Sequence, residues 1–137
     1  MEMRNIKMER LNLIIHNSAN TAPNRIFNLF STLLEKQFPV EDHTQPIELR
    51  SPSEFASRLN IHVNHLNRTL KTIAQKTTSQ LINERILREA KSLLRHTDWS
   101  VATISFVLGF SELTNFHTFF KKHTNWSPVR FRHSFSS

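Results

Sequence analysis

The amino-acid sequence predicts an all-α fold, with two helix-turn-helix subdomains joined by a long linker helix and preceded by one or two short helices. The chain of 137 residues holds a single glycine, Gly109, and few of the apolar–polar alternations that are typical of strands. Its apolar residues recur instead at spacings of three and four, as they do along amphipathic helices. Two segments also repeat one pattern of apolar positions, which indicates two copies of a helix pair.

Residues 1–50 are predicted to form an N-terminal helical connector ahead of a domain in residues 51–137. An apolar stripe over residues 26–38 indicates a helix of about 14 residues, which Pro39 would end. Such a stripe can pack on the rest of the chain or on a second copy of the protein, and packing within the chain is slightly favoured. Residues 39–50 are expected to be a linker.

Capping signals delimit the elements of the domain. Ser51 is followed by a proline and by Glu54, which together form a capping box with proline at the first helical position. A second helix is expected to start around His62. The periodicity and the caps predict a first helix-turn-helix at about 51–76, a linker helix at about 78–96, a second helix-turn-helix at about 100–124 and a closing helix at about 127–133.

The second subdomain has its own start and stop signals. Asp98 or Ser100 is expected to cap its first helix, and Ser111 to cap its second. Gly109 lies where a helix C-terminus would need the left-handed conformation. Ser127, which precedes a proline, is expected to cap the closing helix.

The two subdomains repeat one pattern of apolar positions. The offset is 49 residues in the first helix of each pair (55 to 104) and 50 residues in the second (66 to 116). The equivalent positions are Phe55 and Ile104, Leu59 and Leu108, Leu66 and Phe116, and Leu70 and Phe120. This repeat favours two helix-turn-helix units over a plain helical bundle.

The charge is unevenly distributed along the chain. Residues 1–50 carry six Lys/Arg and six Asp/Glu, whereas residues 51–137 carry twelve and five, so the net charge of +7 belongs to the second part. A basic surface on a small domain favours a polyanion such as nucleic acid.

The outward faces of the second helices carry side chains suited to DNA. In the first subdomain this face holds Asn64, Asn67, Arg68 and Lys71. In the second it holds Thr114, Asn115, Thr118 and Lys122. Arginine can pair with guanine and asparagine with adenine through two hydrogen bonds each, so the first helix is expected to read more of the sequence. A linker of about 18 residues, roughly 27 Å long, is a plausible strut between two such helices.

These residues resemble the C-terminal DNA-binding domain of the AraC/XylS family of bacterial transcription regulators. The resemblance covers residues 51–132, nearly two-thirds of the chain. It rests on Asp98, Ser100, Val101, Ile104, Leu108 to Phe110, Phe116, Phe120 to Lys122, Ser127, Pro128, Phe131 and Arg132, on Glu89 to Leu94, and on His62 to Arg68. It differs from the family at Gln75 and Asn125, where members usually have glycine and a positive φ is expected.

The resemblance implies cytoplasmic promoter binding and control of transcription, often through contact with RNA polymerase. It implies base contacts for Asn64, Asn67, Arg68, Thr114, Asn115 and Thr118. The phosphate contacts are expected from Lys71, Lys121, Lys122, Arg130 and Arg132. About 50 residues precede the domain, fewer than the family's usual sensor domain, so no small-molecule effector is expected. A homodimer through residues 1–38, where residues 1–16 show a more ragged helical pattern, stays an open alternative.

Other classes of protein fit the sequence less well. The chain has no cysteine, no apolar run of about 18 residues and too few glycines for a phosphate-binding loop or a dinucleotide fingerprint. Its eight histidines form no recognised zinc motif and its carboxylates no credible acid–base pair, so neither an enzyme nor a metal or cofactor site is expected. The rival hypothesis is a protein-interaction module that pairs with a full-length relative and antagonises it.

Overall fold

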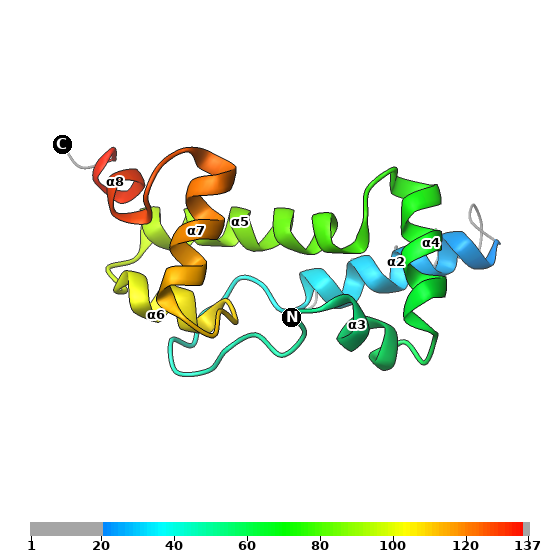
Figure 1. The fold of residues 1–137 in the computed structure, drawn as a ribbon. Coiled ribbons are helices and arrows are strands. Elements are labelled where there is room, and N and C mark those ends of the chain that lie inside the picture. Colours follow the sequence, from blue (N-terminus) through cyan, green and yellow to red (C-terminus); the bar gives the residue numbers. More distant parts are fainter. Residues whose placement is uncertain (1–20, 136–137) are drawn as a thin grey trace. The chain divides into compact units, whose positions relative to one another are not determined.

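A computed structural model of the protein describes residues 21–135, and every regular element among them is an α-helix. The all-α fold predicted from the sequence is therefore confirmed for this part of the chain. The predicted helix over residues 1–16 lies outside it. In chain order the helices are α2 (Ala22–Glu35), α3 (Pro52–Arg58), α4 (Val63–Ala74), α5 (Thr78–His96), α6 (Val101–Val107), α7 (Leu113–Thr124) and α8 (Pro128–His133), as labelled in Figure 1.

The helices group into two compact units, and each unit contains one helix-turn-helix pair. Of the described residues, 21–33 and 52–78 form unit 1, with most of α2 and with α3 and α4. Residues 34–51 and 79–135 form unit 2, with nearly all of α5 and with α6, α7 and α8. The segment 1–50, expected to be a single connector, thus contributes described residues to both units.

The core of unit 1 joins α2 to the first helix pair. Phe30 of α2 and Phe55 of α3 are both buried, and their ring centroids lie 5.0 Å apart in a tilted arrangement. Leu66 and Leu70 of α4 have no exposed surface. Phe30 therefore packs within the chain, as the sequence slightly favoured for the apolar stripe of α2. Leu29, on another face of α2, stays about half exposed.

The core of unit 2 is built around α5. This helix spans the same residues as the linker helix expected from periodicity, and its apolar face is buried along its length. The buried apolar side chains of the unit are Leu34, Phe38, Leu49, Ile82, Ile86, Ala90, Leu93, Leu94, Ile104, Val107, Leu108, Phe116 and Phe120. α8 closes the unit through Phe131, whose ring meets that of Phe120 edge-on at 5.3 Å.

The turn inside each helix pair has the same backbone geometry. Each turn contains one residue with positive φ, Asn60 at 57° in unit 1 and Gly109 at 84° in unit 2. In each, the amide that follows this residue donates to a carbonyl five residues back in the first helix. These bonds run from Ile61 to Ala56 and from Phe110 to Ser105, both at 3.1 Å. The offset of 49 residues in the apolar pattern is thus an offset in backbone hydrogen bonds as well.

The second helix of each pair also ends in the same way. Gln75 after α4 and Asn125 after α7 have φ of 57° and 64°, and each amide donates to the carbonyl four residues earlier. Positive φ was expected at both positions, and both expectations are confirmed. An asparagine adopts this conformation with less strain than a glutamine does.

Three helix starts have side-chain caps, of which those at Ser100 and Ser127 were expected from the sequence. The side chain of His62 accepts from a backbone N–H at 3.3 Å, that of Ser100 at 3.0 Å and that of Ser127 at 3.1 Å. The cap expected at Ser111 is wrong. The N-cap of α7 is Glu112, which makes no side-chain cap hydrogen bond.

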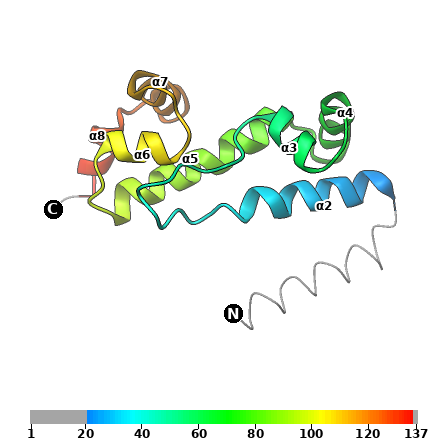
Figure 2. The same ribbon diagram turned by 90° about the horizontal axis from the view of Figure 1, so that it is seen from below.

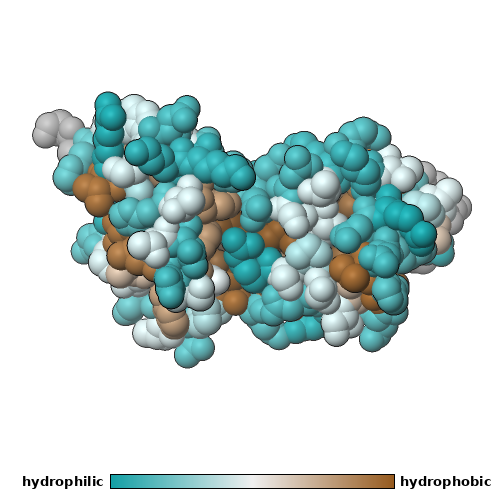
Figure 3. All heavy atoms as spheres, in the orientation of Figure 1, coloured by the Kyte–Doolittle hydropathy of each residue, from teal (hydrophilic) through white to brown (hydrophobic). Residues whose placement is uncertain are grey.

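Hydrophilic surface covers most of the face in Figure 3, with the exposed apolar surface divided into patches. No helix in the described residues is long and apolar enough to cross a membrane. The same residues contain no cluster of three or more histidine, aspartate or glutamate side chains that could hold a metal ion.

Candidate nucleic-acid interface

The outward face of α4 is polar, exposed and free of acidic residues. Asn64, Arg68 and Lys71 are all exposed, while the opposite side of the helix buries Leu66 and Leu70. Val63–Ala74 contains two cationic side chains and no Asp or Glu. Such a face can approach a polyanion without losing a salt bridge of its own helix.

Asn67 has a structural contact that the sequence did not indicate. Its side-chain Oδ1 accepts a hydrogen bond of 2.8 Å from the hydroxyl of Thr78, the first residue of α5 and almost fully buried. Thr78 thus occupies one of the two lone pairs of the Asn67 carbonyl oxygen and fixes the orientation of the amide, whose NH2 group stays available as a donor. A bidentate pair with adenine needs both ends.

Lys71 lies at the C-terminal end of α4. Its Nζ is 3.5 Å from the backbone carbonyl oxygen of Gln75, the residue with positive φ. The ammonium thus sits at the negative end of the helix dipole, where a cation is favoured. Because Lys71 is exposed, a phosphate oxygen could replace this long contact at little cost.

The outward face of α7 begins with local contacts. Thr114 donates to a carboxylate oxygen of Glu112 at 3.5 Å, and the Nδ2 of Asn115 donates to Ser111 at 3.2 Å. Thr118, one turn further on, is exposed. Glu112 is the acidic group nearest the start of α7, and it would repel a phosphate brought to that helix end.

Leu113 is an exposed apolar residue beside this face and was not among the base-reading residues expected from the sequence. It is the first residue of α7, and 42% of its surface is exposed. An exposed leucine at the start of a recognition helix can contact the methyl group of thymine. Its position just after the glycine turn is the sequence signal that could have placed it with the base-reading residues.

The cations after α7 have different environments. Lys121 and Lys122 are exposed on the last turn of α7. The guanidinium carbon of Arg130 lies 4.9 Å from the centre of the Trp126 ring. Arg132 instead points back to α5, where its Nε donates to the carbonyl of Leu94 at 2.9 Å.

The guanidinium of Arg132 makes a second bond to the end of α5. Its terminal nitrogen donates to the backbone carbonyl of Thr97 at 3.4 Å. Arg132 therefore satisfies carbonyls that the helix leaves without partners, and it stands at the negative end of the helix dipole. A phosphate contact by Arg132 would require these bonds to open.

A chain of aromatic rings supports α7 from inside. Phe110, in the turn, lies 5.2 Å from the rings of both Phe116 and Phe119. Phe116 lies 5.9 Å from Phe120, which contacts Phe131 of α8. The orientation of α7 therefore depends on rings contributed by the turn before it and by the helix after it.

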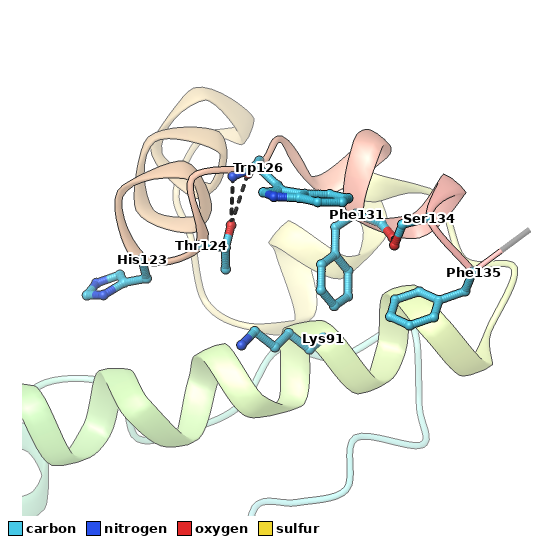
Figure 4. Close-up of a pocket in the computed structure, with 7 residues that line it drawn as sticks. All are labelled: Lys91, His123, Thr124, Trp126, Phe131, Ser134 and Phe135. Carbon is cyan, nitrogen blue, oxygen red and sulfur yellow. Dashed lines mark hydrogen bonds between the residues drawn. The ribbon is translucent and has the colours of Figure 1, made fainter.

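A cavity of about 450 Å³ lies between α5, the end of α7 and α8 (Figure 4). The hydroxyl of Thr124 bridges the backbone N–H and carbonyl of Trp126 at its upper edge, both at 3.1 Å. None of the side chains expected to contact DNA lines this cavity. The lining residues are Lys91, His123, Thr124, Trp126, Phe131, Ser134 and Phe135.

Two helix-turn-helix units with basic, exposed second helices define a DNA-binding class of protein, and comparisons with known proteins identify its family. A family described as "Helix-turn-helix domain" matches residues 55–134. The transcriptional activator RhaS of Escherichia fergusonii is 36% identical over 93 residues, 68% of this chain and 33% of that protein. The chain belongs to the AraC/XylS family of transcription regulators and contains its DNA-binding domain.

Solved structures share this fold. The C-terminal domain of AraT, a response regulator from Geobacillus stearothermophilus, is 20% identical, with a TM-score of 0.67 over 85% of this chain and 88% of that one. The DNA-binding domain of AdpA, solved with a target DNA, is 18% identical, with a TM-score of 0.65 over 80% and 91%. The chain spans 27% and 33% of the length of two RhaS relatives that it matches.

Proposed function

We propose that the protein is a sequence-specific transcription regulator that inserts α4 and α7 into adjacent major-groove segments of a promoter. The observation that carries this proposal is the repeated turn. Asn60 and Gly109 have positive φ at equivalent positions, and the same backbone hydrogen bond follows each of them. Each unit therefore presents its second helix to the outside with its first helix behind it, as a helix-turn-helix does on DNA.

The side chains on the two helices support different roles. Asn64 and Arg68 of α4 are exposed and hold donors that can reach base edges. Thr114, Asn115 and Thr118 of α7 are exposed but offer no arginine fork. We therefore assign most of the direct reading to α4 and a smaller part to α7, with Asn67 reading in the orientation that Thr78 imposes on its amide.

Phosphate contacts are proposed for the exposed cations at the helix ends. Lys71, Lys121, Lys122 and Arg130 are all exposed, and the described residues from 113 to 135 contain no Asp or Glu. Arg132 fits this role less well because its guanidinium is bonded to the end of α5. Phosphate contacts by cations position a protein on a duplex without reading its sequence.

Two further partners are proposed, one from a relative and one from the apolar stripe of this chain. RhaS is named as a transcriptional activator, which supports RNA polymerase as a partner at the promoter. A homodimer through residues 1–38 stays a prediction, and part of that segment lies outside the described residues. The rival hypothesis, a module that antagonises a full-length relative, has no observation in its favour.

Selection of bound duplexes from a random pool tests the proposed function. We expect one asymmetric site of two short blocks about one helical turn apart, because the two recognition helices carry different side chains. Binding should weaken steeply with salt as counterions are released from the phosphates. A palindrome would point to a dimer. Affinity weaker than about 0.1 mM for every duplex at low salt would contradict DNA binding altogether.

A further inference from the structure

Residues 36–50, which run between α2 and α3, lie against α5 and α6. From here on, the connector means this segment alone and not the whole of residues 1–50. Figures 1 and 2 both show its cyan trace running beside these two helices, and it belongs to unit 2. Sequence analysis expected a linker here. The connector instead makes one set of contacts with α5, a second within itself and a third with the turn before α7.

The first set of contacts joins the start of the connector to α5. The backbone N–H of Val40 donates to a carboxylate oxygen of Glu89 at 2.7 Å, and Glu89 is 4% exposed. Arg85 bonds Glu89 at 3.3 Å and Glu35 at 3.0 Å, and its guanidinium carbon lies 4.1 Å from the centre of the Phe38 ring. A buried carboxylate with two such partners holds the connector in one position.

The second set of contacts closes the connector on itself. The side-chain amide of Gln37 donates to the carbonyl of Leu49 at 2.8 Å and accepts from its N–H at 2.6 Å. Leu49 is buried in the core of unit 2. Between these ends, Thr44 donates two hydrogen bonds to the carboxylate of Asp42, one from its hydroxyl and one from its backbone N–H. Both bonds lower the pKa of that carboxyl, and the bond from the hydroxyl is the larger cause.

The third set of contacts reaches the turn before α7. The backbone N–H of Ile47 donates to the carbonyl of Val107, the last residue of α6, at 2.8 Å. The side chain of Arg50 covers the glycine of the turn, so that a Cβ on Gly109 would lie 3.3 Å from the Cδ of Arg50. The guanidinium carbon of Arg50 lies 5.0 Å from the centre of the Phe110 ring.

Phe110 also contacts α7. Its ring packs against Phe116 and Phe119 of that helix, and the other end of the Arg50 guanidinium donates to Asn83 of α5 at 3.3 Å. Arg50 therefore contacts both α5 and Phe110, the ring that packs against α7. The cation–π contact with Phe110 acts on the turn itself, and the hydrogen bond to Asn83 holds the guanidinium in place on α5.

We infer that Arg50 is a positioning residue for the second recognition helix, acting through the turn at Gly109 and Phe110. The connector thereby couples the segment that precedes the domain to α7, so that displacement of the connector weakens reading by α7 and leaves α4 unaffected. This inference rests on the proposed function, because it assigns α7 a share of DNA reading. It predicts that a residue outside both recognition helices controls one block of the site.

Hydrogen exchange of the free protein tests the coupling without DNA. In Arg50→Ala, we expect amides of α6 and α7 to exchange about tenfold faster, the effect of losing one cation–π contact and one hydrogen bond. Amides of α3 and α4 should keep their rates. Lys36→Ala is the matched control, since it removes one positive charge from the same connector and should change neither set. Unchanged exchange in α7 for Arg50→Ala would overturn the inference.

Binding to two-block duplexes then tests the effect on reading. Arg50→Ala should reduce discrimination at the α7 block, measured with that block scrambled, and keep discrimination at the α4 block. Arg50→Lys retains the charge but not the planar group over Phe110, so we expect it to resemble Arg50→Ala. Full rescue by lysine, with a salt slope that falls by about 0.9 in Arg50→Ala, would show a phosphate contact and overturn the inference.

The two proposals fail in different ways. If the wild-type chain binds no duplex, the proposed function is wrong, and the exchange experiment still decides whether Arg50 holds α7. If the wild type binds a two-block site and Arg50→Ala loses both blocks equally, the proposed function stands and the role of Arg50 in positioning α7 is wrong.

Discussion

The Oδ1 of Asn67 accepts a hydrogen bond of 2.8 Å from the hydroxyl of Thr78, which joins α4 to the first residue of α5. Thr78 is 1% exposed, so its hydroxyl has no access to water as an alternative partner. Asn67 thus has a structural role on a face that otherwise points outward. Its amide group is held in one orientation, with the NH2 end left for a second partner.

Thr78→Val should therefore destabilise unit 1 and alter DNA reading at the same time. The substitution keeps the shape of the side chain and removes the hydrogen bond to Asn67, at a cost of about 1 kcal/mol in the free energy of unfolding. Released from Thr78, the Asn67 amide can rotate, so base preference at its position should broaden. Urea unfolding followed by circular dichroism measures the first effect and binding to single-base variants the second.

Thr72→Val is the control for that experiment. Thr72 lies exposed on the same helix, and the same change there should leave both quantities within about 0.5 kcal/mol of wild type. A double-mutant cycle with Asn67→Ala isolates the pair. Additive losses from Asn67→Ala and Thr78→Val would mean that the bond contributes nothing.

Arg68 and Lys121 should respond differently to alanine substitution. Arg68→Ala is expected to cost about 1–3 kcal/mol on the preferred site and to relax preference at one base position, because arginine reads guanine through two bonds. Lys121→Ala should weaken all sequences about equally and reduce the salt slope by about 0.9. Titrations of cognate and scrambled duplexes at several salt concentrations measure both. Equal loss on every sequence from Arg68→Ala would reassign Arg68 to a phosphate.

Arg132→Ala should reduce stability more than DNA affinity. The guanidinium donates to the carbonyls of Leu94 and Thr97, so its loss leaves the end of α5 without these partners. We expect about 1–2 kcal/mol of destabilisation, seen in the unfolding of unit 2 by the fluorescence of Trp99 and Trp126. Once both proteins are fully folded, the affinity for DNA should match wild type.

Arg130→Ala is the matched comparison for Arg132. Arg130 is exposed and stacks on Trp126, so its removal should cost no more than about 0.5–1 kcal/mol of stability. It should weaken binding to all duplexes and lower the salt slope. If Arg132→Ala lowers the slope as Arg130→Ala does, then Arg132 leaves α5 when DNA binds, and the phosphate role implied by the family resemblance is correct.

Local signals in the sequence anticipated much of the fold. The long helix at 78–96 has the range expected from its apolar periodicity, because burial of one face repeats every three or four residues. Positive φ at Gln75 and Asn125 was expected from the family resemblance, because members usually have glycine at both positions. The cap predicted at Ser111 was wrong because α7 begins one residue later than a cap at Ser111 requires. The N-cap is Glu112, whose backbone is extended and whose side chain makes no cap hydrogen bond.

Contacts between distant residues could not be predicted from local patterns. Residues 39–50 contain two prolines and mixed charges, which are typical of an exposed linker. The bond from Ile47 to Val107 joins residues 60 positions apart, and that from Arg132 to Leu94 joins residues 38 apart. No spacing rule indicates such pairs. The outward faces of α4 and α7 were predictable because their inward faces are apolar and periodic, but the partner of Asn67 was not.

Gln75→Gly should stabilise the protein, because Gln75 adopts the left-handed conformation with a side chain. This conformation costs a residue with a Cβ roughly 1–2 kcal/mol. Glycine removes that strain but loses more conformational entropy on folding, by about 0.5–1 kcal/mol. The exposed bond from the Gln75 amide to the carbonyl of Thr72 is also lost. We expect a net gain of about 0.5 kcal/mol, measured by urea unfolding with circular dichroism.

Asn125→Gly is the comparison at the equivalent position of unit 2. Asn125 has the same conformation, but asparagine tolerates it well, so the gain there should be close to zero. Lys76→Gly, one residue after Gln75, should give no gain because its φ is not positive. A loss of stability in Gln75→Gly that equals the loss in Lys76→Gly would show that the left-handed conformation at Gln75 carries no strain that glycine can relieve.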